Sequence, residues 1–197
     1  MLTQPVRRHV MQGLLRALLL CCVWLLPAGA VWSQGVELAT LKTSKSDGGL
    51  NLEFVARITL PKAVEDALRN GVPIYFLAEA QLQRPRWYWR DDRINRVSRQ
   101  WRVAYQPLTG SWRVGLGGLN QTYATLNDAL TAASSSSGWR LADLAQLDAD
   151  KTYTVDFQYQ LDTTQLPGPM QFGLGGLGGP GDWAVGATRV LKVQLTP

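Results

Sequence analysis

Histidine and cysteine are nearly absent from this chain of 197 residues, and the few present lie at its start. The two cysteines are Cys21 and Cys22, and the one histidine is His9. Residues 31–197 therefore cannot form a Ser-His-Asp or Cys-His catalytic arrangement, a zinc site with His or Cys ligands, an iron–sulfur cluster or a haem with a His ligand. Disulfides are excluded there as well, so burial of apolar side chains must stabilise the fold. Carboxylate pairs, lysine, tyrosine, serine or an oxygen-ligated cation remain as sources of chemistry. The candidates among them are weighed below, and we expect no cofactor, no metal site and no catalytic residues.

Charge is also sparse, at 18% of residues against 46% hydrophobic ones. This composition is too apolar for a disordered chain and suits one domain with a sizeable core. The formal net charge is +5, but three of the twenty basic residues lie in the first thirty positions, while all fifteen acidic residues come later. Residues 31–197 therefore carry a net charge of only +2. We expect no nucleic-acid partner.

The first thirty residues have the three regions of a secretory signal peptide. Arg7, Arg8 and His9 form a positive start, and an apolar run follows from Leu14 to Leu26, interrupted by Arg16. Residues 27–30 (Pro-Ala-Gly-Ala) then end the run and supply the small residues that a signal peptidase reads. We expect cleavage after Ala30 and a periplasmic location for residues 31–197.

The alternative is an uncleaved signal that remains as a membrane anchor. The uninterrupted apolar stretch, Ala17–Leu26, has ten residues, whereas a helix that spans a bilayer needs about 20. Cleavage is the favoured interpretation, and it leaves no transmembrane segment in the mature chain.

Beyond residue 31, apolar and polar residues mostly alternate, which is typical of half-buried β-strands. Strands are predicted at residues 36–41, 50–60, 74–82, 97–105, 112–116, 153–161 and 188–195, with an opening hairpin turned at Asp47-Gly48-Gly49. Short helices are predicted at 61–70, after Pro61, and at 126–133, where Thr125 and Asp128 can cap the start. We expect loops at Ser134–Gly138 and in the Gly/Pro-rich stretch at 167–181.

This pattern predicts a mainly β domain over residues 31–197: an antiparallel two-sheet sandwich, immunoglobulin- or fibronectin III-like, with two short helices. Leu147 stands six residues before Tyr153, as in the tyrosine corner of those folds, where the phenol hydroxyl bonds to the backbone. The alternative is an ordinary turn before an amphipathic strand.

Other candidates for chemistry have simpler explanations. Asp91 and Asp92 are neighbours, so in an extended chain their carboxylates point to opposite faces. Asp148 and Asp150 lie in a predicted turn, where Asp is favoured for its local backbone bonding. Residues 173–178 match G-x-G-x-x-G, but Pro180 and Gly181 follow where a nucleotide site needs a helix. None of these is predicted to be catalytic or to bind a nucleotide.

Arginine and aromatic residues gather in one segment, from Arg84 to Arg113. It holds eight of the twelve arginines found after residue 30 and carries a net charge of +6, while the rest of residues 31–197 carries −4. Arginine stacks on aromatic faces and binds carboxylate or phosphate groups through two hydrogen bonds. The segment therefore suits contact with an acidic protein, anionic lipid headgroups or a glycan.

The segment divides into two parts. Trp101 and Trp112 are expected to belong to the core, with Arg96 and Arg102 on the solvated face of a strand. Three consecutive aromatics at 87–89 cannot all point inward, so they are predicted to form an exposed contact site. The candidate partner- or ligand-binding residues are Arg86, Trp87, Tyr88, Trp89, Arg90 and Arg93.

The order of motifs resembles the DUF4390 family of exported proteobacterial proteins. Its most specific marks here are a helix followed by Gly71-Val72-Pro73 and a strand, and Leu-Asp-x-x-Gln-Leu-Pro at residues 161–167. The Gly-rich stretch after Met170 departs from the family pattern. The resemblance implies an envelope protein of unknown biochemical function and provides no catalytic residues. By gene neighbourhood only, it also suggests an association with a nitrogen-regulation-type membrane sensor kinase.

Three functions follow as hypotheses. The first is a periplasmic, non-catalytic protein-interaction module that uses the Arg86–Arg93 surface on an acidic periplasmic or membrane protein, such as a sensor kinase ectodomain in envelope signalling. The second is a ligand-binding module for a glycan or small anion at the same segment. The third is an enzyme that uses carboxylates or lysine.

Overall fold

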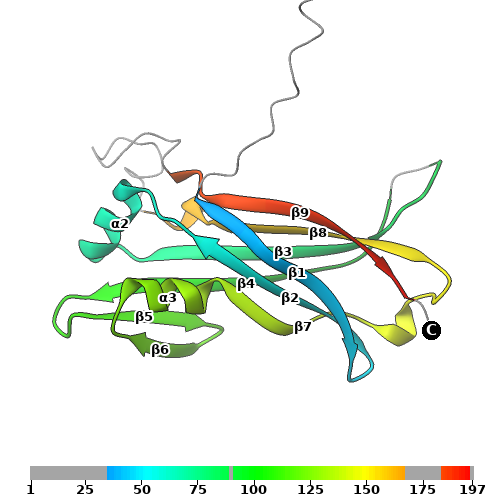
Figure 1. The fold of residues 1–197 in the computed structure, drawn as a ribbon, viewed down its shortest axis with the longest axis horizontal. Coiled ribbons are helices and arrows are strands. Elements are labelled where there is room, and N and C mark those ends of the chain that lie inside the picture. The colour runs from blue at the N-terminus through cyan, green and yellow to red at the C-terminus, as the bar shows by residue number, and fades with distance from the viewer. Residues whose placement is uncertain (1–34, 89–90, 167–182, 196–197) are drawn as a thin grey trace, which may run out of the picture. The chain divides into compact units, whose positions relative to one another are not determined.

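The structure, a computed structural model, describes residues 35–88, 91–166 and 183–195. In these residues, nine strands form two sheets in which all neighbouring strands are antiparallel (Figure 1). The smaller sheet has the order β1-β2-β7, and the larger has the order β6-β5-β4-β3-β8-β9. The strands are β1 (Val36–Ser46), β2 (Gly49–Ile58), β3 (Ile74–Arg84), β4 (Asp92–Gln106), β5 (Ser111–Leu116), β6 (Leu119–Tyr123), β7 (Ser135–Asp143), β8 (Thr152–Leu161) and β9 (Gly186–Gln194).

Two hairpins close through two-residue turns that require left-handed backbone. The opening hairpin, β1–β2, turns at Asp47 and Gly48, whose φ angles are 50° and 68°. The β5–β6 hairpin turns at Gly117 and Gly118, with φ angles of 55° and 90°. Positive φ at both central positions is the geometry that matches the twist of paired strands. The predicted opening hairpin is confirmed.

Both predicted helices are present as α2 (Lys62–Arg69) and α3 (Leu126–Ala133), together with short 3₁₀ turns η1 (Leu144–Gln146) and η2 (Thr163–Gln165). Thr125 caps α3: its Oγ1 accepts the backbone N–H of Asp128 at 3.1 Å and donates to the Asp128 carboxylate at 2.7 Å. Pro61 precedes α2, which connects the two sheets. The local signals for both helices were therefore correct.

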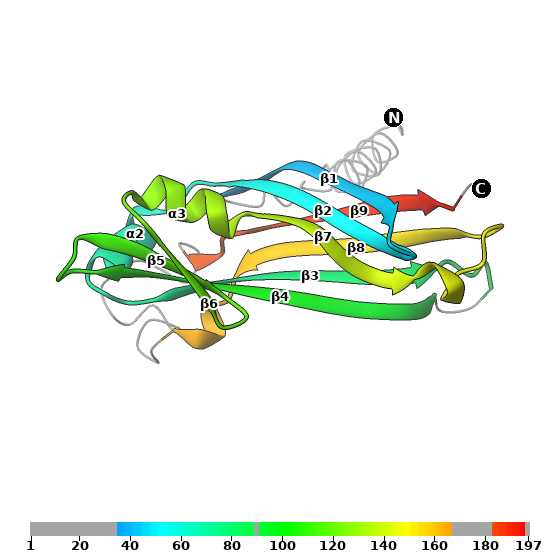
Figure 2. The ribbon, with the colours of Figure 1, turned by 90° about the horizontal axis from the view of Figure 1, so that it is seen from below.

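The core lies between the two sheets and is rich in aromatic rings. Phe54 of β2 faces the larger sheet, with ring centroids 4.9 Å from Phe157, 5.5 Å from Tyr159 and 5.9 Å from Trp101. Helix α3 packs beside the smaller sheet and covers β4, β5 and β6 (Figure 2). The buried Tyr159 hydroxyl donates to the carbonyl of Ala133 at the end of α3, at 2.9 Å, and burial raises the pKa of this phenol.

The larger sheet has six strands and the smaller has three. Polar side chains of the larger sheet reach the two edge strands of the smaller one. On one side, Asn95 of β4 donates to the carbonyl of Leu141 on β7 at 2.6 Å. Nearby, Arg99 stacks over the ring of Trp139 at 5.2 Å, and burial lowers the pKa of its guanidinium. On the other side, Arg189 of β9 donates to the carbonyl of Leu38 on β1 at 2.8 Å. Side chains of the larger sheet thus satisfy carbonyls at both edges of the smaller one.

Two strands were not predicted. Residues 119–123 form β6, and the expected loop at Ser134–Gly138 is wrong, because β7 begins at Ser135. Ser135 and Ser136 pair with Val55 and Phe54 of β2 despite the weak strand preference of serine. The ladder then shifts register near Gly138, whose φ of 58° suits a bulge.

The coarse fold prediction, a mainly β domain with two antiparallel sheets and two helices, is confirmed. The predicted corner also forms: the Tyr153 hydroxyl accepts the backbone N–H of Asp148 at 2.8 Å, and Leu147 is buried. The predicted loop at 167–181, with its glycine motif, lies outside the described residues. No helix within the described residues has the length and apolar character needed to cross a membrane.

Candidate functional site

The connection between β3 and β4 carries the predicted contact site. We call Arg84–Tyr88 the β3–β4 tip. Its Trp87 and Tyr88 side chains are 93% and 66% exposed, and their rings meet edge to face with centroids 4.9 Å apart. The prediction that these aromatics point outward is confirmed for Trp87 and Tyr88, while Trp89 and Arg90 lie outside the described residues.

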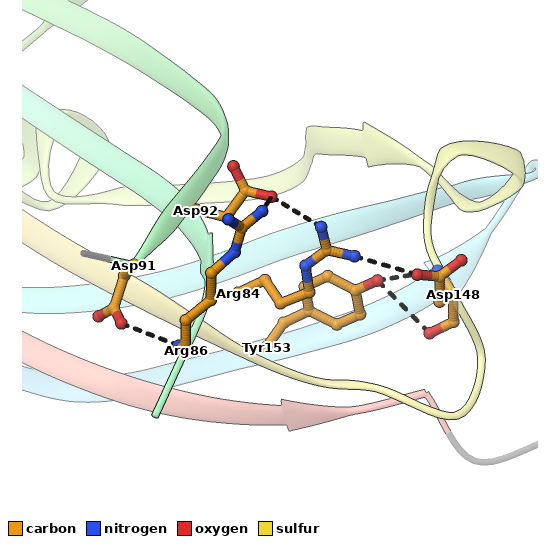
Figure 3. A network of polar contacts seen from close by, with 6 residues as sticks. All are labelled: Arg84, Arg86, Asp91, Asp92, Asp148 and Tyr153. Carbon is orange, nitrogen blue, oxygen red and sulfur yellow. Dashed lines mark hydrogen bonds and ion pairs between the residues drawn. The ribbon is translucent and has the colours of Figure 1, made fainter. Parts of the chain in front are cut away.

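A network of ion pairs holds the base of the tip (Figure 3). Arg84 contacts Asp92 at 2.7 Å and Asp148 at 3.1 Å, and Arg86 contacts the same Asp92 oxygen at 2.8 Å. Hydrogen bonds from Arg84, and then from Arg86, lower the pKa of Asp92, and the bond to Asp92 is the main cause that raises the pKa of Arg84. The shared carboxylate of Asp92 therefore joins the start of β4 to the end of β3 and to the tip.

Asp91 and Asp92 do not act together. Asp91 accepts the backbone N–H of Arg86 at 3.2 Å, while Asp92 binds the two guanidinium groups, and the two side chains point in different directions (Figure 3). The expectation that neighbouring carboxylates diverge is confirmed. Both are occupied in shaping the tip.

The tyrosine corner connects this network to the core. Asp148 binds Arg84 through its carboxylate and Tyr153 through its backbone N–H (Figure 3). Tyr153 is 1% exposed, so its ring is fixed by packing. The sequence suggested the corner as a fold marker, but it did not show that the corner also supports the tip.

An open cavity of about 670 Å³ lies against the tip. Its cationic lining residues are Arg84 and Arg86 from the tip, Lys151 from the turn before β8, and Lys192 from β9. Thr152 and Thr154 add hydroxyls, and Trp87 and Tyr88 add aromatic surface. Within the described part of the chain, neither Lys151 nor Lys192 forms an ion pair, so this surface can receive negative charge.

Sequence reasoning missed Lys151, Thr152, Thr154 and Lys192 as parts of the site. Lys192 pairs with Thr154 in the β8–β9 ladder, and Thr154 pairs with Gln83 in the β3–β8 ladder. These residues meet the tip because β8 and β9 follow β3 in the sheet. A pattern of alternation predicts strands but not their order, so no local signal could have identified this group.

The other arginines and tryptophans follow the predicted division. Trp101 and Trp112 are buried, Arg102 is exposed, and Arg96 pairs with Glu79 at 2.8 Å. Arg93 is exposed on β4 next to the tip. In residues 35–88, 91–166 and 183–195, no group of three or more His, Cys, Asp or Glu side chains is placed to hold a metal ion.

The family model of a domain of unknown function, DUF4390, matches residues 33–188. The chain belongs to this family. The match includes β1 to β8, the whole tip, its ion pairs and Lys151, whereas Lys192 lies just beyond it. No curated protein and no solved structure matches the chain. Membership in DUF4390 confirms the resemblance found in the motifs and assigns no activity to any residue.

Proposed function

We propose that this DUF4390 protein is a non-catalytic interaction module that binds an acidic partner protein through the β3–β4 tip. The observation that carries the proposal is the exposure of Trp87, at 93%, beside the exposed Tyr88 and Arg86. Tryptophan, tyrosine and arginine are the residue types that contribute most energy at protein interfaces. Burial of these two rings by a partner would remove a large apolar surface from water.

The support beneath the tip strengthens the proposal. Arg84 is held by Asp92 and Asp148, so the base of the tip is fixed before a partner arrives, and less conformational entropy is lost there on binding. Arg86, Lys151 and Lys192 add positive charge to the adjoining cavity. Charge of one sign favours association with a surface of the opposite sign.

A non-catalytic role agrees with how the carboxylates near the tip are used. Asp91, Asp92 and Asp148 each accept hydrogen bonds that shape the tip or bind its arginines. Among the residues that the structure describes, those that line the cavity supply cations and hydroxyls but no carboxylate. An enzyme that uses lysine is the competing interpretation, and activity lost on Lys151→Ala or Lys192→Ala would favour it.

We infer that residues 1–30 are an export signal and that the mature chain begins at Val31 in the periplasm. The charged start, the apolar run and Ala28-Gly29-Ala30 support this inference. The partner that the family resemblance suggests is the ectodomain of a membrane sensor kinase, which would face the same compartment. N-terminal sequencing of the protein from fractionated cells should give Val31 in the periplasmic fraction. A chain that begins at Met1 in the membrane fraction would contradict export with cleavage.

Crosslinking in cells tests the interaction. A photoreactive amino acid at position 87 should capture a specific protein, and Arg86→Glu should abolish the adduct because it reverses charge at the tip. Position 108 is the matched control, because Leu108 is fully exposed on the turn between β4 and β5 and lies outside the tip. The same adducts from positions 87 and 108, or none from either, would contradict the proposal.

The cavity favours a second candidate, a binding site for a glycan or small anion. Its threonine hydroxyls, lysines and aromatic rings suit a sugar that carries a carboxylate or phosphate. Anionic cell-wall fragments should quench the tryptophan fluorescence of the wild type, and the quenching should be lost in Trp87→Phe and weakened in Lys192→Glu. Unchanged fluorescence with every fragment would dismiss this candidate and leave the protein partner.

The relation to immunoglobulin and fibronectin III sandwiches remains a proposal about the fold. The corner formed by Leu147, Asp148 and Tyr153 supports it. The division of the described strands into sheets of three and six gives a wider larger sheet than those folds have. We infer that any relation is confined to the corner and its flanking strands.

A further inference from the structure

Each sheet ends in edge strands, which present unpaired backbone N–H and C=O groups to the surroundings. The edges are β1 and β7 in the smaller sheet and β6 and β9 in the larger. An exposed edge can pair with a strand of another chain, and proteins usually prevent this with charged side chains, bulges or covering groups. These four edges, formed by the described strands, differ in how far they are protected.

Three of the edges carry such protection. The β1–β2 ladder shifts register between Leu38 and Thr40, and Arg189 occupies the Leu38 carbonyl. The β2–β7 ladder shifts register twice, and Asn95 occupies the Leu141 carbonyl. Strand β9 presents the charges of Arg189 and Lys192. Strand addition at these edges is therefore disfavoured.

The fourth edge, β6, has none of these features. Its five residues, Leu119-Asn120-Gln121-Thr122-Tyr123, include no charge and no proline, and its ladder with β5 has no register shift. Five residues is an ordinary strand length. Leu119 is 76% exposed, and among the described strands β6 pairs with β5 alone. Within the residues that the structure describes, this edge is open to another strand.

We propose that two copies of this chain pair antiparallel along β6, which joins their larger sheets across a two-fold axis at Gln121. In this register Gln121 lies opposite its own counterpart, Asn120 lies opposite Thr122 of the partner, and Leu119 lies opposite Tyr123 of the partner. A symmetric dimer uses the same patch on both copies, and this five-residue strand matches itself in that way. Each of the five residues of β6 therefore has a partner residue in the second copy.

The hydrogen-bond pattern of β6 agrees with this register. Leu116 and Leu119 flank a two-residue turn and form a hydrogen-bonded pair, as do Val114 and Gln121 two positions on. Asn120 and Thr122 therefore direct their N–H and C=O groups away from β5, toward the free edge. In the dimer these two residues face each other across the axis, so their backbone groups can form four hydrogen bonds.

Charge favours a second copy as the occupant of this edge. In a two-fold dimer the same patch of each copy meets itself, so a patch with a net charge, such as residues 84–113, would oppose like charges. The β6 strand is uncharged, so none of its proposed cross-strand pairs does so. The dimer uses no residue of the β3–β4 tip, and its test is independent of the proposed function.

Disulfide crosslinking tests the register. In an antiparallel pair without mutual hydrogen bonds, Cα atoms lie about 4.5 Å apart, within reach of a disulfide. The full chain with Gln121→Cys should form a covalent dimer on mild oxidation. Leu108→Cys, at a fully exposed position, and the unsubstituted chain, which contains Cys21 and Cys22, set the background. A yield at position 121 no higher than these controls would overturn the proposed register.

Opposite charges introduced at position 121 provide the second test. They distinguish a loss of pairing between two copies from a loss of folding. Gln121→Lys and Gln121→Glu each place like charges opposite one another, so each should raise the dimer Kd by about two- to fivefold. An equal mixture of the two variants should form heterodimers at least as tightly as the wild type, which native mass spectrometry can count. A wild-type chain that sediments as a monomer, or a mixture that forms no heterodimer, would overturn the proposal.

Discussion

At the scale of single residues, Asp92 connects the start of β4 to the tip, because one of its carboxylate oxygens accepts hydrogen bonds from both Arg84 and Arg86. Trp87 is exposed directly after these arginines. If Asp92 were neutral, the negative charge that offsets the two guanidinium groups would be lost, and they would repel each other. The ion pairs at the base of the tip therefore depend on the ionised state of this carboxyl group.

The pH dependence of stability should reveal this carboxylate. The pKa of Asp92 is lowered from its ordinary value of 3.8, so its contribution to folding is complete above about pH 4 and is lost as the pH falls through the lowered value. Asp92→Asn should therefore destabilise the protein near pH 7, and the difference from the wild type should shrink toward pH 2.5. Urea unfolding at several pH values, followed by tryptophan fluorescence, measures both effects.

Asp150→Asn is the matched control, because Asp150 is exposed in the turn beside Asp148 and takes no part in the tip network. It should leave the acid limb of the stability curve unchanged. A difference between Asp92→Asn and the wild type that stays constant from pH 7 to pH 2.5 would show that the carboxylate does not act through its charge.

At the scale of elements, the structure agrees with local sequence signals at the cap of helix α3 and at the turn of the opening hairpin. Helix α3 begins at Leu126 as predicted, because the Thr125 hydroxyl accepts the backbone N–H of Asp128 and donates to the Asp128 carboxylate. The opening hairpin turns at Asp47 and Gly48, residue types that tolerate positive φ. These elements were predictable because the residues responsible for them are adjacent in the sequence.

The two unpredicted strands lack such signals. Strand β7 starts with a run of serines and contains a bulge at Gly138, so alternation is interrupted where the strand begins. Strand β6 is exposed over most of its length and shows little contrast between its faces. Both exist because of a partner strand, β2 or β5, rather than because of their own preferences.

The cap of α3 should have a measurable effect on stability. Thr125→Ala removes the hydroxyl that accepts the Asp128 N–H, so we expect a loss of about 1 kcal/mol in the free energy of unfolding. Thr125→Ser keeps the hydroxyl and should restore most of that loss. Chemical denaturation of both variants decides this, and equal losses in the two would indicate that packing of the Thr methyl group is responsible.

At the scale of the whole molecule, the contact between the two sheets depends on Phe54, which is fully buried and touches rings of the larger sheet. Phe54→Ala should lower the free energy of unfolding by about 3–5 kcal/mol through lost burial and a cavity. The next residue on β2, Val55, points to the other face and is exposed. Val55→Ala should cost about 1 kcal/mol or less, and similar losses for both variants would contradict the assigned faces.

The candidate site shows where sequence reasoning ends. Three consecutive aromatics predicted an exposed contact, and Trp87 and Tyr88 are exposed. The lysines and threonines of the cavity come from β8, its preceding turn and β9, so they join the tip only through the order of strands in the larger sheet. That order depends on pairings between distant parts of the chain, which no local pattern records.

The position of β3 has a mechanical consequence. This strand leads directly to the tip and is hydrogen-bonded along its length to β4 on one side and β8 on the other. A partner that pulls on Trp87 along the strand direction would load both ladders in shear, so many hydrogen bonds would share the force instead of breaking one at a time. Force that reaches Arg84 along β3 would thus be divided between two neighbouring strands of the larger sheet.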